Sequence, residues 1–128
     1  MEGIYHVWFS TKQRQVALEG ELGDDARQLL IETAQRTGIR LVQVEVTADH
    51  AHLLVALTGT QTLPSVMHQL KGASARYILL KYPDLRFDLA HNSFWQKGYG
   101  WRKITAAEGP AVRHYIRTQG DRPLRHNV

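Results

Sequence analysis

Residues 42–57 read VQVEVTADHAHLLVAL, and this stretch decides the fold. On both sides of Ala48 and Asp49, apolar residues alternate with other residues, which is the pattern of half-buried β-strands. A two-residue hairpin loop at Ala48-Asp49 places every apolar residue of one strand opposite an apolar residue of the other: Val46 opposite Ala51, Val44 opposite Leu53, and Val42 opposite Val55. Because a slip of one residue loses this match, we predict a hairpin with this register.

The other face of the hairpin carries residues that can do chemistry. His50 and His52 are two apart on one strand, so their side chains project to the same side, away from the main core. These two residues are either ligands of a shared metal ion or ordinary surface histidines. Imidazole suits divalent transition metals, and added oxygen ligands favour Mg²⁺ or Mn²⁺. Glu45 lies across from His52 in this register, where it could orient the imidazole, ligate the ion or simply be solvated.

The other segments complete an α+β domain that we expect to span residues 1–128 as one unit. The predicted elements are a strand at residues 4–10, a helix from Asp24 to Thr37 ended by Gly38, a helix from Leu63 to Lys81 ended by Pro83, a strand around Tyr99 to Ile104, and a last helix that begins near Pro110 and is closed by Gly120. Their order predicts a ferredoxin-like (RRM-like) antiparallel sheet with two helices on one face and an added C-terminal helix.

Side-chain periodicity assigns faces to these elements. The first strand is expected to turn Tyr5, Val7 and Phe9 to the core, with His6 and Trp8 on the opposite face. The helix from Leu63 to Lys81 is expected to bury a stripe of four residues and to expose a polar face, with Val66, Leu70, Ala73 and Tyr77 in the stripe and Lys71, Ser74 and Arg76 on the polar face. The histidine pair then lies on the open face of the sheet.

The last predicted helix offers a phenol and an amide together. Val112 and Ile116 form a core stripe, and Tyr115 and Gln119 form a neighbouring stripe one residue step away. A tyrosine beside a core stripe is more often a packing residue. In the functional alternative, Tyr115 is a nucleophile and the amide oxygen of Gln119 is a third, neutral metal ligand; a phenol with an ordinary pKa near 10 then needs a nearby metal or base.

Composition narrows the classes of protein. Cysteine is absent from the 128 residues, which excludes disulfides and thiolate metal sites, and the net charge of +4 modestly favours a polyanionic partner. We expect no membrane span and no signal peptide, and therefore a cytoplasmic location. Trp8 could stack on a nucleobase and several cations could meet phosphates, although each alone is as well explained by packing or solvation: Lys12, Arg14, Lys71, Arg76, Arg102 and Lys103.

Together these motifs resemble the single-tyrosine HUH transposases of small bacterial insertion sequences (the insertion-sequence 200/605 type), in which HUH denotes histidine, hydrophobic residue, histidine. Five stretches carry the resemblance in the family's order: YHVWFSTK at residues 5–12, DHAHLLV at 49–55, LKGASAR at 70–76, FWQKGY at 94–99, and YIRTQ at 115–119. The sequence departs from the family at Ala48, where proline is frequent, and in the loop from Thr105 to Pro110, which leaves the placement of the tyrosine helix open.

The resemblance implies an activity that spacing alone does not. Such enzymes bind hairpins at the ends of single-stranded DNA, and Tyr115 is expected to attack a phosphate, leaving a 5′-phosphotyrosine link and a free 3′-OH that permits rejoining. His50, His52 and Gln119 are expected to hold Mg²⁺ or Mn²⁺. Members typically act as homodimers, often with the tyrosine helix of one subunit completing the site of the other.

Three other functions fit parts of the same pattern. A domesticated copy could process chromosomal hairpins as a nuclease without moving itself. A non-catalytic module could bind single-stranded nucleic acid on the open sheet. A small metal-dependent oxygenase could use the histidine pair, but the order of helices argues against the barrel that such enzymes usually need.

Overall fold

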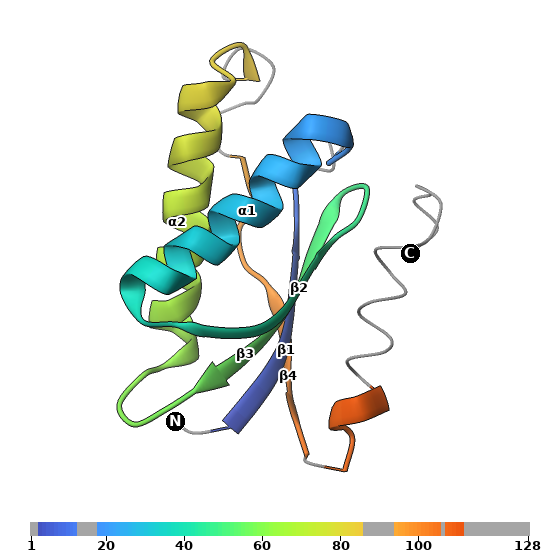
Figure 1. Ribbon diagram of the computed structural model, residues 1–128, viewed down its shortest axis with the longest axis vertical. Coiled ribbons are helices and arrows are strands. Elements are labelled where there is room, and N and C mark those ends of the chain that lie inside the picture. The colour runs from blue at the N-terminus through green and yellow to red at the C-terminus, as the bar shows by residue number, and fades with distance from the viewer. Residues whose placement is uncertain (1–2, 13–17, 86–93, 106, 112–128) are drawn as a thin grey trace.

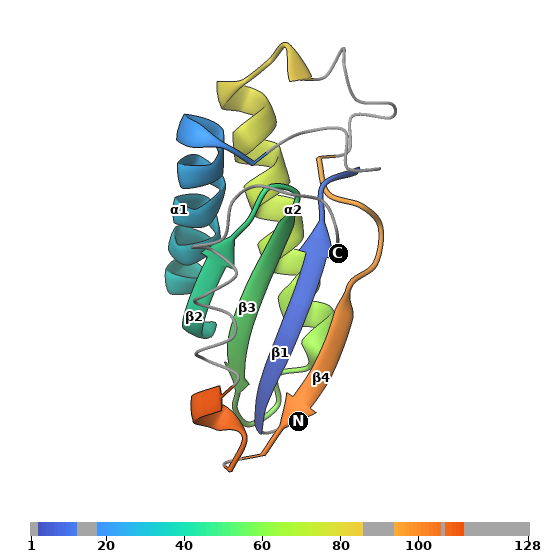
Figure 2. The ribbon, with the colours of Figure 1, turned by 90° about the vertical axis from the view of Figure 1, so that its right-hand side faces the viewer.

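Four antiparallel strands, covered on one face by two helices, form the core of the protein (Figure 1). The computed structural model describes residues 3–12, 18–85, 94–105 and 107–111. The elements are β1 (Gly3–Ser10), α1 (Gly20–Thr37), β2 (Arg40–Val46), β3 (His50–Leu57), α2 (Leu63–Lys81) and β4 (Gly100–Ile104). The strand order is β2-β3-β1-β4, and Figure 2 shows α1 and α2 together behind the sheet. The predicted α+β architecture and its element order are confirmed for these residues.

The predicted C-terminal helix is described only at its start. Residues 109–111 are helical, where the last helix was predicted to begin. The remainder of that predicted helix, with Tyr115 and Gln119, lies outside the described residues. No helix in the described part of the chain combines the length and the apolar character needed to cross a membrane.

The hairpin of β2 and β3 has the predicted turn and most of the predicted register. The backbone N–H of Thr47 donates to the carbonyl of His50 at 2.8 Å, so Ala48 and Asp49 form the loop. The pairs of Val46 with Ala51 and of Val44 with Leu53 are confirmed, but the predicted pair of Val42 with Val55 is wrong because Leu41 faces Val55. A bulge between Leu41 and Gln43 adds a residue to β2 and reverses the parity of the strand beyond it. Val42 therefore packs with Leu54 and Ile104 in a second small cluster.

The first helix begins earlier than predicted. α1 begins at Gly20 rather than Asp24, and the added first turn includes the buried Gly23, whose low helix propensity argued against a helix there. Gly23 lies directly against the backbone of Leu18, where a Cβ atom would be 2.6 Å from the Leu18 carbonyl oxygen. The predicted end is confirmed, since Gly38 adopts a left-handed conformation with φ 72° and its N–H donates to Ala34.

The main core lies between the sheet and the helices. Tyr5, Val7 and Phe9 of β1 are buried there, as predicted. In α2, however, Ser74 is fully buried and Tyr77 is 38% exposed, so both predictions for these residues were wrong. The Ser74 hydroxyl can be buried because it donates to the Leu70 carbonyl of its own helix at 2.6 Å. The Tyr77 ring instead lies beside the guanidinium groups of Arg36 and Arg76, 5.3 and 5.2 Å from its centroid.

Two polar residues of α2 hold the segment that leads into β4. The Trp95 indole N–H donates to the Ser74 hydroxyl oxygen at 2.9 Å inside the core. The Lys71 ammonium donates to the carbonyls of Gln96 at 2.8 Å and Gly98 at 2.5 Å. These contacts place the start of β4 beside β1.

We expect Ser74→Ala to lower the free energy of unfolding by about 1–3 kcal/mol, because it leaves the buried Trp95 N–H without its acceptor. Urea unfolding followed by circular dichroism measures this change. Ser65→Ala, at an exposed position of the same helix, is the matched control and should change stability by less than about 0.5 kcal/mol. Equal stabilities for the two variants would contradict the role assigned to Ser74.

Candidate functional site

Three imidazole rings lie in a row on the sheet face that is turned away from the helices. His50 and His52 come from β3, and His6 comes from the adjacent strand β1. The ring centroids of His50 and His52 are 6.1 Å apart with an interplanar angle of 25°, and those of His6 and His52 are 5.6 Å apart at 28°. The alternation of β3 produces this placement, because Ala51 and Leu53 are completely buried on its other face.

The Nδ1 atom of each predicted histidine ligand has a polar partner. His50 Nδ1 is 2.6 Å from a carboxylate oxygen of Asp49, whose residue is only 3% exposed. His52 Nδ1 is 3.3 Å from Nε2 of His6. No described residue makes a hydrogen bond to Nε2 of either ring. The Nε2 atoms are therefore the nitrogens that these two side chains can offer to a metal.

The electrostatic environment keeps the central imidazole neutral. Burial, followed by the neighbouring imidazoles of His6 and His50, lowers the pKa of His52 from 6.5 to about 4. Burial and the positive charge of Arg102 also lower the pKa of His6. Because a metal binds the unprotonated form of imidazole, His52 is ready to act as a ligand at pH 7 without losing a proton.

Glu45 lies directly opposite His52, as the predicted register required. The hydrogen-bond partner of His52 Nδ1 is nevertheless the ring of His6, on the other neighbouring strand. A role for Glu45 in orienting His52 or in holding the ion stays a prediction.

Among the predicted DNA-contacting residues, Trp8 and Arg102 lie on the same sheet face as the histidines. Where β1 pairs with β4, Arg102 lies opposite His6 and Gly100 lies opposite Trp8. Where β1 pairs with β3, His52 lies opposite Trp8. The Trp8 ring covers Gly100 so closely that a Cβ atom there would lie 2.1 Å from it. The lack of a side chain at Gly100 therefore lets the indole lie across β4.

The remaining predicted contacts lie elsewhere. Lys103 pairs with Tyr5 and so belongs to the face of the sheet on which the helices pack. Lys71 and Arg76 project from α2, and Lys12 follows the end of β1, where its N–H donates to the carbonyl of Phe94. Arg14 lies outside the described residues. Of the described residues in this set, only Trp8 and Arg102 share a sheet face with the histidine pair, and DNA contacts by all of the set stay predictions.

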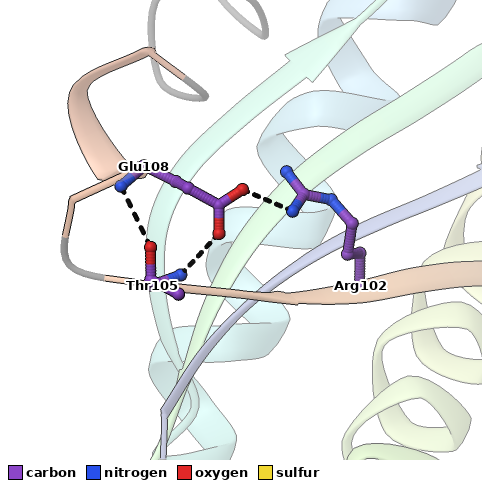
Figure 3. A network of polar contacts seen from close by, with 3 residues as sticks. All are labelled: Arg102, Thr105 and Glu108. Atoms are coloured by element: carbon purple, nitrogen blue, oxygen red, sulfur yellow. Dashed lines mark hydrogen bonds and ion pairs between the residues drawn. The ribbon is translucent and has the colours of Figure 1, made fainter.

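Arg102 connects this face to the start of the predicted C-terminal helix (Figure 3). Its guanidinium contacts a carboxylate oxygen of Glu108 at 2.6 Å. The other carboxylate oxygen accepts the N–H of Thr105 at 3.0 Å, and the Thr105 hydroxyl accepts the N–H of Glu108 at 3.2 Å. This reciprocal pair is a capping box, which satisfies backbone donors where the helix begins.

The site is incomplete within the described residues. Tyr115 and Gln119, the predicted nucleophile and third ligand, lie outside them. In the described part of the chain, no group of three or more His, Cys, Asp or Glu side chains is placed to hold one metal ion. Two adjacent imidazoles, whose Nε2 atoms make no hydrogen bond to a described residue, fit a divalent ion that takes its other ligands from oxygen atoms.

Sequence reasoning missed three contributors to this face. His6 had a signal, because alternation in β1 turned it away from the core, but only the strand order makes it a neighbour of His52. Asp49 was assigned only to the hairpin loop. The capping box was readable in the spacing of Thr105 and Glu108.

Comparisons of the sequence with a family model and with known proteins point to the same family. Residues 1–119 match the family described as "Transposase IS200 like". The chain is 32% identical over 118 residues to the ISDra2 transposase TnpA of Deinococcus radiodurans, covering 92% of this chain and 84% of that protein. It is 30% identical over 115 residues to the transposase for insertion sequence element IS200 of Salmonella typhimurium, covering 90% of this chain and 75% of that protein.

Two solved structures share the fold. A crystal structure from Deinococcus radiodurans R1, assigned as a transposase, superposes with a TM-score of 0.75 at 29% identity, covering 93% of this chain and 92% of that chain. A REP-associated tyrosine transposase, solved bound to a REP hairpin, superposes with a TM-score of 0.68 and covers 91% of this chain and 66% of that chain. Its identity of 14% supports similarity of fold only.

The charge on Glu108 should make the contribution of the capping box depend on pH. Backbone and side-chain hydrogen bonds from Thr105, with one from Arg102, lower the pKa of Glu108 from 4.5 to about 2. A carboxylate with a lowered pKa stabilises the fold above pH 4.5, and this contribution is lost as the pH falls towards 2. We expect Glu108→Gln to be less stable than wild type at pH 7, with a difference that shrinks between pH 4.5 and 2.

Thermal unfolding of both proteins across this pH range measures the difference. Glu32→Gln, on the surface of α1, is the matched control and should differ from wild type at pH 7 by less than Glu108→Gln does. A difference for Glu108→Gln that stays constant from pH 7 to 2 would contradict the assigned contacts.

Proposed function

The chain belongs to the family of IS200-like transposases, and from this premise we propose that it cleaves and rejoins single-stranded DNA at hairpin ends. The hydroxyl oxygen of Tyr115 attacks a DNA phosphorus atom, and the bond from phosphorus to the 3′ oxygen breaks. The phenol proton is lost and the 3′ oxygen gains one, so the products are a 5′-phosphotyrosine link and a free 3′-OH. Attack by a 3′-OH on the phosphotyrosine reverses the step and rejoins the strands.

The single observation that supports this proposal best is the outward-facing pair of imidazoles on the open sheet face. His50 and His52 would bind the metal through Nε2, and the amide oxygen of Gln119 would complete the protein ligands. A bound Mg²⁺ or Mn²⁺ supplies Lewis-acid polarisation of the phosphate. Asp49 is in contact with Nδ1 of His50, and burial keeps His52 in its neutral form.

The DNA is proposed to lie across the same face. Trp8 offers an indole beside His52 for stacking on a base, and Arg102 offers a positive charge near His6 for a phosphate. The REP-associated tyrosine transposase of the same fold was solved bound to a REP hairpin, and we propose a DNA hairpin as the ligand of this chain. We further propose that the protein acts as a homodimer in the cytoplasm. The tyrosine helix of each subunit completes either the site of its own subunit or the site of the other subunit.

We expect Tyr115→Phe to abolish covalent attachment of the protein to DNA, because phenylalanine has no nucleophilic oxygen. A labelled single-stranded DNA hairpin from the end of the insertion sequence is mixed with protein and Mn²⁺. The reaction products are then separated on a denaturing gel. Wild type should give a shifted band, and this band should not form when chelator is present during the reaction. Tyr77→Phe, at an exposed position far along α2, is the control and should retain the band.

An adduct that persists in Tyr115→Phe would show that another residue is the nucleophile. Adduct formation by wild type without rejoining of strands would favour a hairpin-processing nuclease. Hairpin binding that survives chelator and both His50→Ala and Tyr115→Phe, with no cleavage, would favour a non-catalytic binding module.

We expect His50→Ala and His52→Ala each to weaken Mn²⁺ binding by at least tenfold, because each removes one of the two imidazole ligands. Electron paramagnetic resonance of free Mn²⁺ during titration of the protein measures the affinity. His68→Ala removes an exposed histidine of α2 and should bind Mn²⁺ as wild type does. Unchanged affinity in the first two variants would place the metal elsewhere.

A further inference from the structure

His6 is a buried imidazole that neither the proposed nucleophile nor the proposed ligand set uses. It lies in the middle of β1, with β3 on one side and β4 on the other, and is only 8% exposed. An imidazole ring is polar, so its burial in a sheet requires polar partners. Its ring nitrogen Nε2 is 3.3 Å from Nδ1 of His52, and the two rings are inclined by only 28°.

The direction of this hydrogen bond follows from the chemistry of a metal ligand. A neutral imidazole has one nitrogen with a proton and one with a free lone pair, and a metal takes the lone pair. If Nε2 of His52 binds the ion, the proton must be on Nδ1, which then donates. The atom within reach of that proton is Nε2 of His6, which accepts it.

We propose that His6 is a positioning residue for the metal centre, which fixes the ring orientation and the tautomer of His52 by accepting its Nδ1 proton. This inference rests on the proposed function, because it takes His52 to be a metal ligand. It gives His52 the same support that the Asp49 carboxylate gives His50. The two ligands are thus oriented by two different residues, one in the hairpin loop and one in the neighbouring strand.

The surroundings of His6 hold its ring in place. The indole of Trp8 lies against it, with centroids 4.9 Å apart and planes inclined by 52°. Trp8 in turn occupies the space that Gly100 leaves open on β4. A ring confined in this way can define the orientation of His52, whereas a mobile surface side chain could not.

The tautomer of His52 can be measured directly in the metal-free protein by nitrogen-15 NMR of the imidazole rings. In wild type we expect the proton of His52 on Nδ1. In His6→Ala we expect a shift towards the Nε2-protonated tautomer, which prevails for imidazole without a partner. His6→Gln, whose amide oxygen can accept the same proton, should restore the Nδ1 tautomer in large part.

Mn²⁺ affinity provides the second measurement on the same proteins. We expect His6→Ala to weaken binding roughly 10–100-fold, as is typical when the partner of a ligand histidine is removed, with partial recovery in His6→Gln. His68→Ala should leave both the His52 tautomer and the affinity unchanged. Circular dichroism and urea unfolding identify the variants that remain folded, and His6→Gln keeps the test usable if His6→Ala does not fold.

The outcomes separate this inference from the proposed function. If wild type binds Mn²⁺ through His50 and His52, but His6→Ala keeps the same affinity and tautomer, His6 is not a positioning residue and the proposed function stands. An Nε2-protonated His52 in wild type would also overturn the role of His6. If wild type binds no Mn²⁺ and forms no DNA adduct, the proposed function itself is overturned, and the role of His6 with it.

Discussion

The register of the hairpin formed by β2 and β3 is the constraint on which the rest of the site depends. Its closing pair, Thr47 and His50, sets which residues of β3 face the helices and which face away. Because side chains alternate along a strand, a shift by one residue would bury both histidines and expose their apolar neighbours. The hydrophobic effect on Ala51, Leu53 and the rest of that face therefore orients the proposed metal ligands, although these apolar side chains lie on the opposite face of the strand.

Part of the sheet face that is turned away from the helices is buried. Leu54 and Ile104 are buried there with Val42, next to the row of imidazoles. His52 is itself partly buried on this face, and its burial is the largest cause of its lowered pKa. A neutral, fixed imidazole is a better-prepared ligand than a solvated one, because neither a proton nor conformational freedom is lost when the ion binds.

The helical layer contributes to this face from the other side of the sheet. Ser74 and Lys71 of α2 hold Trp95 and the carbonyls of Gln96 and Gly98. These contacts place β4 against β1, where Arg102 lies beside His6 and reaches Glu108 at the start of the C-terminal helix. One continuous series of contacts thus runs from the core to the histidine face and on to the segment that precedes Tyr115.

The sequence alone determined the features that depend on neighbours along the chain. Alternation identified β1 and the hairpin, helical periodicity and Pro83 identified α2, and the spacing of His50 and His52 identified the candidate ligands, because strands and helices repeat over a few residues. Only the tertiary structure decided the features that depend on contacts across the sheet: the bulge at Leu41, the burial of Ser74, and the place of His6 beside His52. These could not be read from local patterns, since strand order brings together residues that are 46 positions apart. The physical reason is that periodicity specifies which face a side chain takes, whereas packing specifies what it meets there.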